Sequence, residues 1–112
     1  MSRIVFEKPM REILYRESRV AKVLGDPSKY AIINLLLNSS PRTVSELVKK
    51  SRRSQPTVFH HLANLRSLEV VRYETKPDGV YYWIKYPQEL RAIVNALSTF
   101  IRKTQHGLEQ DF

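Results

Sequence analysis

The side chains of this chain of 112 residues form no constellation typical of an enzyme or a metal site. There is no cysteine, which excludes disulfides, thiolate catalysis and cysteine-based zinc sites. Two of the three histidines, His60 and His61, are adjacent, so on a helix their side chains point about 100° apart. The sequence has no glycine-rich phosphate loop, no G-x-S-x-G motif and no paired carboxylates beside a histidine. We therefore expect neither an enzyme nor a cofactor, and no bound metal.

Positive charge is the remaining chemical feature. The formal net charge is +8 and the pI is near 10.0, which favours a polyanionic partner such as nucleic acid or an anionic membrane. Residues 42–76 carry a net charge of +5, whereas residues 77–112 are neutral overall. The centre of this excess is the cluster Lys49-Lys50-Ser51-Arg52-Arg53. A solvated turn would explain the cluster equally well, because a phosphate-binding role needs an adjacent element that reads bases.

Composition and length favour one globular domain over residues 1–112. Hydrophobic residues make up 42% of the chain and charged residues 27%. The longest apolar runs, such as residues 31–33, are far too short to span a membrane, and the first ten residues do not read as a secretory signal. We expect a cytoplasmic protein without a membrane partner.

Two short helices must position the basic cluster. Thr43-Val44-Ser45-Glu46 has the form of a capping box and predicts a helix that runs to about Lys50. A second helix is predicted to start at Ser54 as N-cap, with Pro56 in its first turn. Its apolar stripe is formed by Val58, Leu62, Leu65 and Leu68. Two short helices joined this tightly over residues 43–68 predict a helix-turn-helix.

A β-hairpin is predicted directly after these helices. Residues 70–75 and 80–85 are rich in Val, Tyr and Trp, which favour strands. Lys76-Pro77-Asp78-Gly79 between them has the composition of a hairpin turn. A hairpin over residues 70–85 that follows a helix-turn-helix forms a wing. The fold class is therefore α+β and mostly helical, a winged helix-turn-helix.

Further helices flank this unit. The first is predicted over about residues 10–24 and ends at Gly25, and Asp26-Pro27 opens a central core helix that is followed by a loop at residues 38–41. The last helix begins at Pro87, runs to about residue 106 and is expected to lie outside the compact core. Its apolar stripe can fold back on the first helix or pair with a second copy, and we expect a homodimer. The expected interface consists of Ile13, Leu14, Leu90, Ile93, Val94, Leu97, Phe100 and Ile101.

In this order and spacing, three segments between Val20 and Leu97 resemble the ArsR/SmtB family of winged-helix repressors. They are residues 24–29 (LGDPSK), residues 54–62 (SQPTVFHHL) and residues 80–84 (VYYWI). The resemblance implies a homodimer that binds a palindromic operator, and in many members a metal or other effector that releases it.

The chain departs from the family pattern at several positions. Arg52-Arg53 stands where the family has Gly and an aliphatic residue, Glu69 replaces a helix-ending Gly, and Phe59 replaces Ser. If Arg52 must adopt a left-handed conformation, it carries a small strain. The cysteine-containing metal motif of the family is absent, and residues 46–50 read ELVKK. On the last helix Glu89, His106 and Glu109 lack the pairing that the family's second metal site uses.

The resemblance and the docking of recognition helices assign roles to individual residues. The first turns of such a helix face the major groove, so we expect Gln55, Thr57, Phe59 and His60 to read bases. The alternatives are helix capping for Gln55 and Thr57, and core packing for Phe59. We expect His61 to be a partly buried structural residue. Phosphate contacts are expected from Lys49, Lys50, Arg52, Arg53, Ser54, Asn64, Arg66, Arg72 and Lys76.

The sequence thus predicts a regulator that binds double-stranded DNA sequence-specifically. The expected form is a homodimeric repressor of a palindromic operator that does not sense metal through cysteine. One alternative is a basic protein that coats DNA without choosing sites, and another is a winged helix that binds a protein partner. The aromatic strand residues 81–83 could line a pocket for a small-molecule effector, although core packing explains them more simply.

Overall fold

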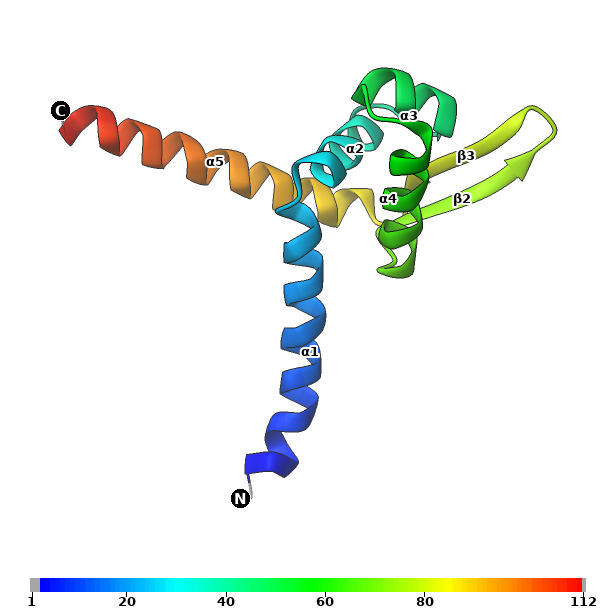
Figure 1. The fold of residues 1–112 in the computed structure, drawn as a ribbon. Helices are drawn as coiled ribbons and strands as arrows, with labels where there is room; N and C mark the ends of the chain where they lie inside the picture. Colours follow the sequence, from blue (N-terminus) through cyan, green and yellow to red (C-terminus); the bar gives the residue numbers. More distant parts are fainter. Residues whose placement is uncertain (1–2, 112) are drawn as a thin grey trace.

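The computed structural model describes the backbone of residues 3–111 and the side chains of residues 11–105. Within these residues the chain forms five helices and a three-stranded antiparallel sheet of order β1-β3-β2 (Figure 1). The elements are α1 (Arg3–Leu24), α2 (Pro27–Asn38), β1 (Arg42–Thr43), α3 (Val44–Ser51), α4 (Gln55–Ser67), β2 (Val71–Lys76), β3 (Gly79–Ile84) and α5 (Pro87–Asp111). The structure confirms the predicted winged helix-turn-helix, with α3 and α4 as its two helices and β2–β3 as the wing.

Side-chain caps fix the starts of the three central helices. The Asp26 carboxylate accepts hydrogen bonds from the backbone N–H groups of Ser28 (2.9 Å) and Lys29 (3.1 Å) at the start of α2. The capping box of Thr43 and Glu46 opens α3, and Ser54 caps α4. Each cap satisfies backbone donors that have no partner within the helix.

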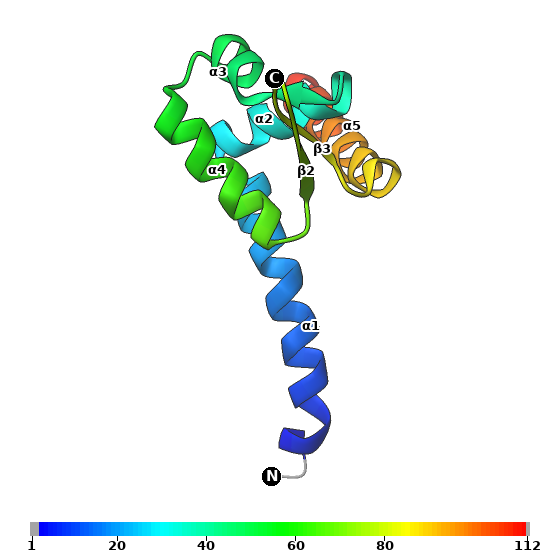
Figure 2. The ribbon, with the colours of Figure 1, turned by 90° about the vertical axis from the view of Figure 1, so that its right-hand side faces the viewer.

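The core surrounds α2, with α3 and α4 on one side of it and α5 on the other (Figure 2). Its largest fully buried side chains are Ile32, Ile33, Leu36, Leu47, Val58, Leu62, Leu65 and Val71. Because the inner stripe of α4 is buried here, its orientation is set by the core and its opposite face is left to solvent.

Two arginines hold the C-terminal end of α2. The Nε of buried Arg42 donates to the carbonyl oxygens of Ser39 (2.8 Å) and Leu35 (3.2 Å). From α5, Arg91 donates to the carbonyl oxygen of Leu37 (2.8 Å). The Leu35 carbonyl oxygen also accepts from the Ser39 N–H (3.0 Å), whereas the last turn of the helix has carbonyls without donors of its own, such as that of Leu37. Both positive charges interact favourably with the negative end of the helix dipole.

Several predicted boundaries were wrong. The first helix begins at Arg3 rather than near residue 10, and α5 continues to Asp111 rather than ending near residue 106. The predicted loop at residues 38–41 is shorter, because α2 includes Asn38 and strand β1 follows at Arg42. The wing strands are β2 and β3 as given above, and Lys76 pairs with Gly79, so that only residues 77–78 form the turn.

The last helix does not lie outside the core. Leu90 and Val94, expected at an interface between copies, are 7% and 9% exposed and pack within the protomer. Helical periodicity shows that a face is apolar but does not show which neighbour covers it. The remaining residues of the stripe extend beyond the core.

The molecule is extended because α1 and α5 leave the core in different directions (Figure 1). Its radius of gyration is 17.3 Å, compared with about 13 Å for a compact domain of this length. Neither helix therefore covers the other. Among the described residues, no helix is long and apolar enough to cross a membrane.

Candidate nucleic-acid interface

The outer face of α4 carries three of the four predicted base-reading residues. Gln55 and His60 are exposed, and Phe59 is 52% exposed. The alternative in which Phe59 packs against the core is therefore wrong, because Val58 and Leu62 occupy the buried positions of this helix. An exposed amide, imidazole and aromatic ring on one helix can offer hydrogen bonds and apolar contact to base edges.

The fourth residue, Thr57, is half-buried and takes part in the helix cap. The Ser54 hydroxyl donates to the Thr57 hydroxyl (2.8 Å), and the Thr57 N–H donates to the Ser54 Oγ (3.3 Å). Ser54 rather than Gln55 is the N-cap. The Gln55 amide is therefore not engaged as the cap of α4, whereas Thr57 has a structural role there.

His61 and Asn64 lie on the inner side of α4, one turn apart, and both are half-buried. Within the described residues, His61 Nδ1 and Asn64 Oδ1 are buried without a hydrogen-bond partner. Burial lowers the pKa of His61 below its usual value of 6.5, and Lys29 lowers it further while Asp26 raises it. His61 is thus the partly buried residue that the sequence predicts.

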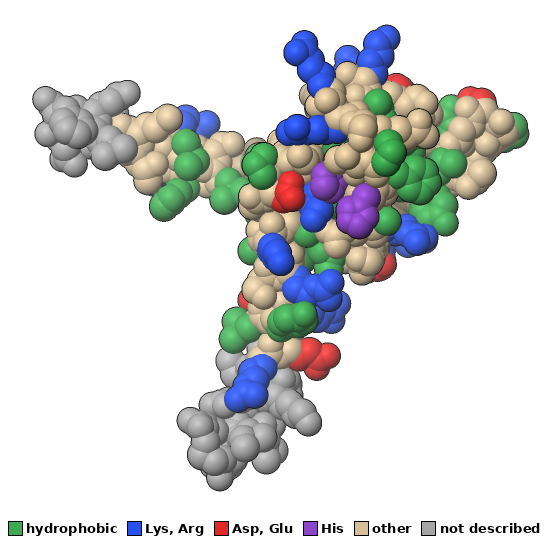
Figure 3. Space-filling model, viewed as in Figure 1, with side chains coloured by type: hydrophobic (Ala, Val, Ile, Leu, Met, Phe, Trp, Pro, Cys, Tyr) green, Lys and Arg blue, Asp and Glu red, His purple; other side chains and the backbone are tan. Residues whose placement is uncertain are grey.

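The predicted phosphate-binding cations around the turn are all exposed. Lys49 and Lys50 lie in the last turn of α3, and Arg52 and Arg53 follow in the turn before α4. Figure 3 shows Lys and Arg side chains projecting from the end of the molecule that α3 forms. Arg52 has a φ of 60° and its N–H donates to the carbonyl oxygen of Val48 (3.0 Å). It therefore occupies the left-handed position at which helices usually end in glycine.

A second group of cations lies on the wing side of α4. The Arg66 guanidinium is 5.0 Å from the centre of the Tyr73 ring, and Arg66 and Arg72 border an open hollow with Ser67. At the wing tip Lys76 Nζ lies 5.2 Å from the centre of the Tyr81 ring. Arg66 thus belongs to α4, whereas Arg72 and Lys76 belong to β2, and Lys76 also lies 3.8 Å from the Glu74 carboxylate.

The tip and base of the wing are fixed by polar contacts. The Tyr81 hydroxyl donates to the Asp78 carboxylate (2.6 Å), which raises the pKa of Tyr81. At the base, Glu69 has a φ of 63° and forms an ion pair with Lys85. The hydrogen bond between them lowers the pKa of Glu69 and raises that of Lys85.

The apolar residues predicted to join two copies are exposed on α1 and α5, except for the two in the core. They are Ile13 (57%), Leu14 (58%), Ile93 (42%), Leu97 (40%), Phe100 (64%) and Ile101 (51%). Several large apolar side chains exposed on neighbouring turns of a helix are typical of an interaction surface.

No group of three or more potential metal ligands is present among the described side chains. The ligands considered on the last helix include His106 and Glu109, whose side chains lie outside the described residues. The aromatic wing strand has a packing role, since Tyr82 is buried and stacks on Tyr73 with ring centres 5.5 Å apart.

Sequence reasoning missed a third group of cations, on the side of α4 away from the wing. Arg19, Lys22 and Lys29 border a hollow of about 320 Å³ between α1, α2 and α4. Asn64 is the polar residue that α4 contributes to this hollow. In the sequence Arg19 and Lys22 read as the polar side of an amphipathic helix, and their position beside α4 depends on tertiary packing.

A helix with exposed polar and aromatic side chains, flanked by cations and followed by a β-hairpin, defines a winged-helix DNA-binding protein. The family model of the bacterial regulatory proteins of the arsR family matches residues 26–73. The chain is 30% identical over 94 residues to the arsenical resistance operon repressor of Staphylococcus xylosus, with 83% of this chain and 88% of the repressor covered. It is 28% identical to the transcriptional repressor SdpR of Bacillus subtilis, covering 81% and 99% of the two chains.

A solved structure supports the same fold. The homodimeric winged helix-turn-helix DNA-binding domain Mb0332 from Mycobacterium bovis superposes with a TM-score of 0.72 at 22% identity, covering 82% of this chain and 86% of that one. The chain belongs to the arsR family of bacterial regulatory proteins. It is a transcriptional regulator that binds DNA through its helix-turn-helix, and the family is not enzymatic.

Proposed function

We propose that the protein is a homodimeric repressor that recognises an inverted-repeat operator. The observation that carries this proposal is the outer face of α4, where Gln55, Phe59 and His60 are exposed between two groups of cations. In each protomer α4 enters the major groove and these residues contact base edges. Gln55 pairs with an adenine, and Phe59 packs on a thymine methyl group.

Homodimerisation is supported by the apolar faces of α1 and α5. Leu97, Phe100 and Ile101 extend beyond the core and require cover. The Mycobacterium bovis domain with the same fold is homodimeric. Two-fold pairing places the two α4 helices about 34 Å apart, in successive major grooves on one side of the duplex.

The cations are proposed to increase the affinity for DNA of any sequence. Lys49, Lys50, Arg52 and Arg53 contact phosphates at the start of α4, and the wing-side cations contact them at its other end. Each such contact releases counterions, so binding weakens steeply with salt. Ser54 and Asn64 are proposed to add hydrogen bonds to the backbone.

Repression is supported by the two relatives described above, both of which are named as repressors. This chain has no cysteine, so it has no thiolates with which to bind arsenite or a soft metal. If release is controlled by an effector, we propose a small molecule rather than a thiolate-bound metal.

The test is capture of genomic DNA by the purified protein near 150 mM salt, followed by sequencing of the bound fragments. A few strongly enriched fragments that share an inverted repeat support the proposal. The second candidate is a DNA-coating protein, which the net charge of +8 favours. It predicts broad, weak enrichment that modest added salt removes. Absence of any enrichment, with or without added cell extract, would contradict both and favour a protein-binding module.

A further inference from the structure

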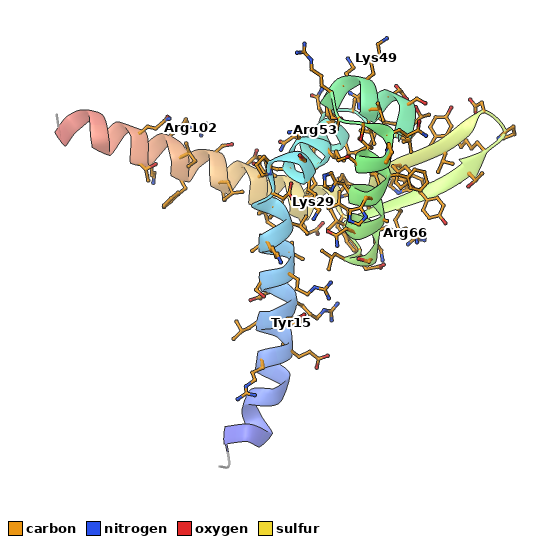
Figure 4. The ribbon with its side chains drawn as sticks, in the orientation of Figure 1. Tyr15, Lys29, Lys49, Arg53, Arg66 and Arg102 are labelled. Atoms are coloured by element: carbon orange, nitrogen blue, oxygen red, sulfur yellow. The ribbon has the colours of Figure 1, made fainter. Side chains whose placement is uncertain are left out.

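The cations on α1 and α2 lie on the same face of the molecule as the recognition helix. Figure 4 places Arg53, Lys29 and Tyr15 in a column on one side of α4, and Arg66 on the other side toward the wing. Arg19 and Lys22 belong to the same column, because they border one hollow with Tyr15, Lys29 and Asn64. We call Arg19, Lys22 and Lys29 the α1 basic row.

Little negative charge opposes this row. Lys29 Nζ is 3.9 Å from the Asp26 carboxylate, whose other oxygen caps α2. Arg19 stacks over the Tyr15 ring at 5.7 Å. Lys22 has no ion pair within the part of the chain that the structure describes, and both Arg19 and Lys22 are exposed. The row therefore presents net positive charge around the hollow.

The centre of the row faces away from the apolar stripe of its own helix. At about 100° per residue, Lys22 lies on the opposite side of α1 from Ile13 and Leu24, whereas Arg19 lies at the border and also lines a hollow with Leu24 and Ile93. Pairing of two copies through that apolar stripe leaves the basic row accessible beside α4.

A helix in the major groove has a phosphate backbone on each side. The wing-side cations Arg66 and Arg72 are placed to contact the phosphate backbone of one DNA strand. We propose that the α1 basic row binds the phosphate backbone of the other strand, with a phosphate seated at the hollow between α1, α2 and α4. The DNA-binding surface then extends from the helix-turn-helix and wing onto the first helix of the chain. This inference rests on the proposed entry of α4 into the major groove.

The hollow has the chemistry that a phosphodiester requires. It is large enough for a phosphate with its water, and Tyr15, Ser18, Val23 and Leu68 line it together with the three cations and Asn64. The Ser18 hydroxyl donates to the Tyr15 carbonyl oxygen (2.7 Å), so the cations supply the contacts to an anion. Asn64 is the polar residue that α4 contributes to the lining. A lysine or arginine here contacts DNA by charge, so the row should add affinity to all sequences equally.

The experiment compares the salt dependence of DNA binding in the full chain and in the double variant Arg19→Ala/Lys22→Ala. Fluorescence anisotropy with a labelled 30-base-pair duplex of random sequence gives the slope of log affinity against log salt. The slope should shrink by about 0.9 for each phosphate that the variant no longer neutralises, up to about 3.6 for two residues in both copies. The charge-conserving variant Arg19→Lys/Lys22→Arg should retain most of the slope.

The matched control is Arg102→Ala/Lys103→Ala, which removes the same charge from exposed positions on α5, far from α4 (Figure 4). Sedimentation confirms that every variant keeps its assembly state. Equal slopes for the two alanine variants would overturn the inference. Because random DNA is the probe, this result is independent of whether the wild type recognises an inverted repeat.

A free anion would be the other source of the same chemistry. Thermal melting in phosphate and in chloride of equal ionic strength, without DNA, tests this source. Stabilisation by phosphate in the wild type but not in Arg19→Ala/Lys22→Ala, with an unchanged DNA salt slope, would assign the hollow to a free anion and overturn the DNA assignment. A reduced salt slope of DNA binding in the variant, without stabilisation of the wild type by phosphate, supports the DNA assignment.

Discussion

Gln55 is the residue whose loss should affect sequence choice most directly. It stands in the first turn of α4, exposed, beside the Ser54 cap. We predict that Gln55→Ala lowers discrimination at one base pair in each half-site by about 1–3 kcal/mol, because a bidentate pair with adenine is removed. Competition binding with operators altered at single positions measures the effect.

Lys49→Ala is the control for this prediction. Lys49 is exposed at the end of α3 and is proposed to contact phosphate. Its removal should weaken binding to operator and random DNA by the same factor. The assignment of Gln55 fails if the ratio of operator to random affinity in Gln55→Ala equals that of the wild type.

His61 should make stability depend on pH. Its pKa is lowered in the folded state, mainly by burial. The unfolded chain therefore binds a proton at pH values where the folded protein does not, and stability falls as the pH drops below 6.5. We predict that the wild type loses Tm between pH 7.5 and 5.5 and that His61→Gln loses less.

The exposed neighbour His60 provides the matched variant for this measurement. His60→Gln should keep the wild-type dependence of Tm on pH. If His61→Gln and the wild type show the same decrease in Tm over this range, half-buried His61 is not the group responsible.

Residue-scale predictions succeeded where the determinants are local. Asp26, Thr43 and Ser54 cap the helices that the sequence assigned to them, because a cap depends on residues within one turn. Local patterns did not decide whether Phe59 faces inward or outward, since that depends on how α4 rotates against α2. The unpaired buried atoms of His61 and Asn64 are likewise a product of packing.

At the scale of elements, the connections before and after α4 each contain a residue with a left-handed backbone conformation. Arg52 and Glu69 both have positive φ, the region that suits glycine. We predict that Arg52→Gly raises the free energy of unfolding by about 1 kcal/mol, because the left-handed strain is relieved. The same variant should bind all DNA more weakly, through loss of a cation next to the backbone. Urea unfolding and anisotropy measure the two effects.

Arg53→Gly separates conformation from charge. It removes the same charge one residue later, at a position that does not have positive φ. Glycine there only adds freedom to the unfolded chain, so this variant should be less stable than the wild type. A gain in stability in both variants, or in neither, would contradict the role assigned to the Arg52 backbone.

Elements that depend on distant partners were not predictable. Strand β1 has two residues and exists because Arg42 and Thr43 pair with Tyr82 and Tyr81 of β3. The contact of Arg91 with Leu37 joins residues 54 positions apart, which no local pattern reveals. The helices and the hairpin were predicted because their caps, period and turn lie within single segments.

At the scale of the whole molecule, α1 and α5 form two arms whose apolar faces are uncovered in one chain. The helical period of the sequence identified the apolar stripe on α5. In the structure Leu90 and Val94 of this stripe are buried in the core, and its other four residues are exposed. Only the tertiary structure shows that the α1 basic row lies beside α4. Sequence reasoning assigned charges to helices, and the fold decides which of them share a face with the recognition helix.

The exposed half of this stripe gives the last prediction. Leu97→Asp places a charge in the proposed contact between copies, and the protomer should still fold because Leu97 is 40% exposed. We predict a monomer by sedimentation with an unchanged circular dichroism spectrum. Affinity for the inverted repeat should fall much more than affinity for random DNA, since two linked half-sites become two separate binding events.

Asn95→Asp adds the same charge on the exposed polar side of α5 and should remain dimeric. A Leu97→Asp protein that stays dimeric would show that the copies pair through another surface. A monomer that keeps the full wild-type preference for the repeat would show that recognition does not require two copies. Either result would break the link between the apolar faces of the two arms and operator recognition, because that link predicts the loss of dimer and of preference together.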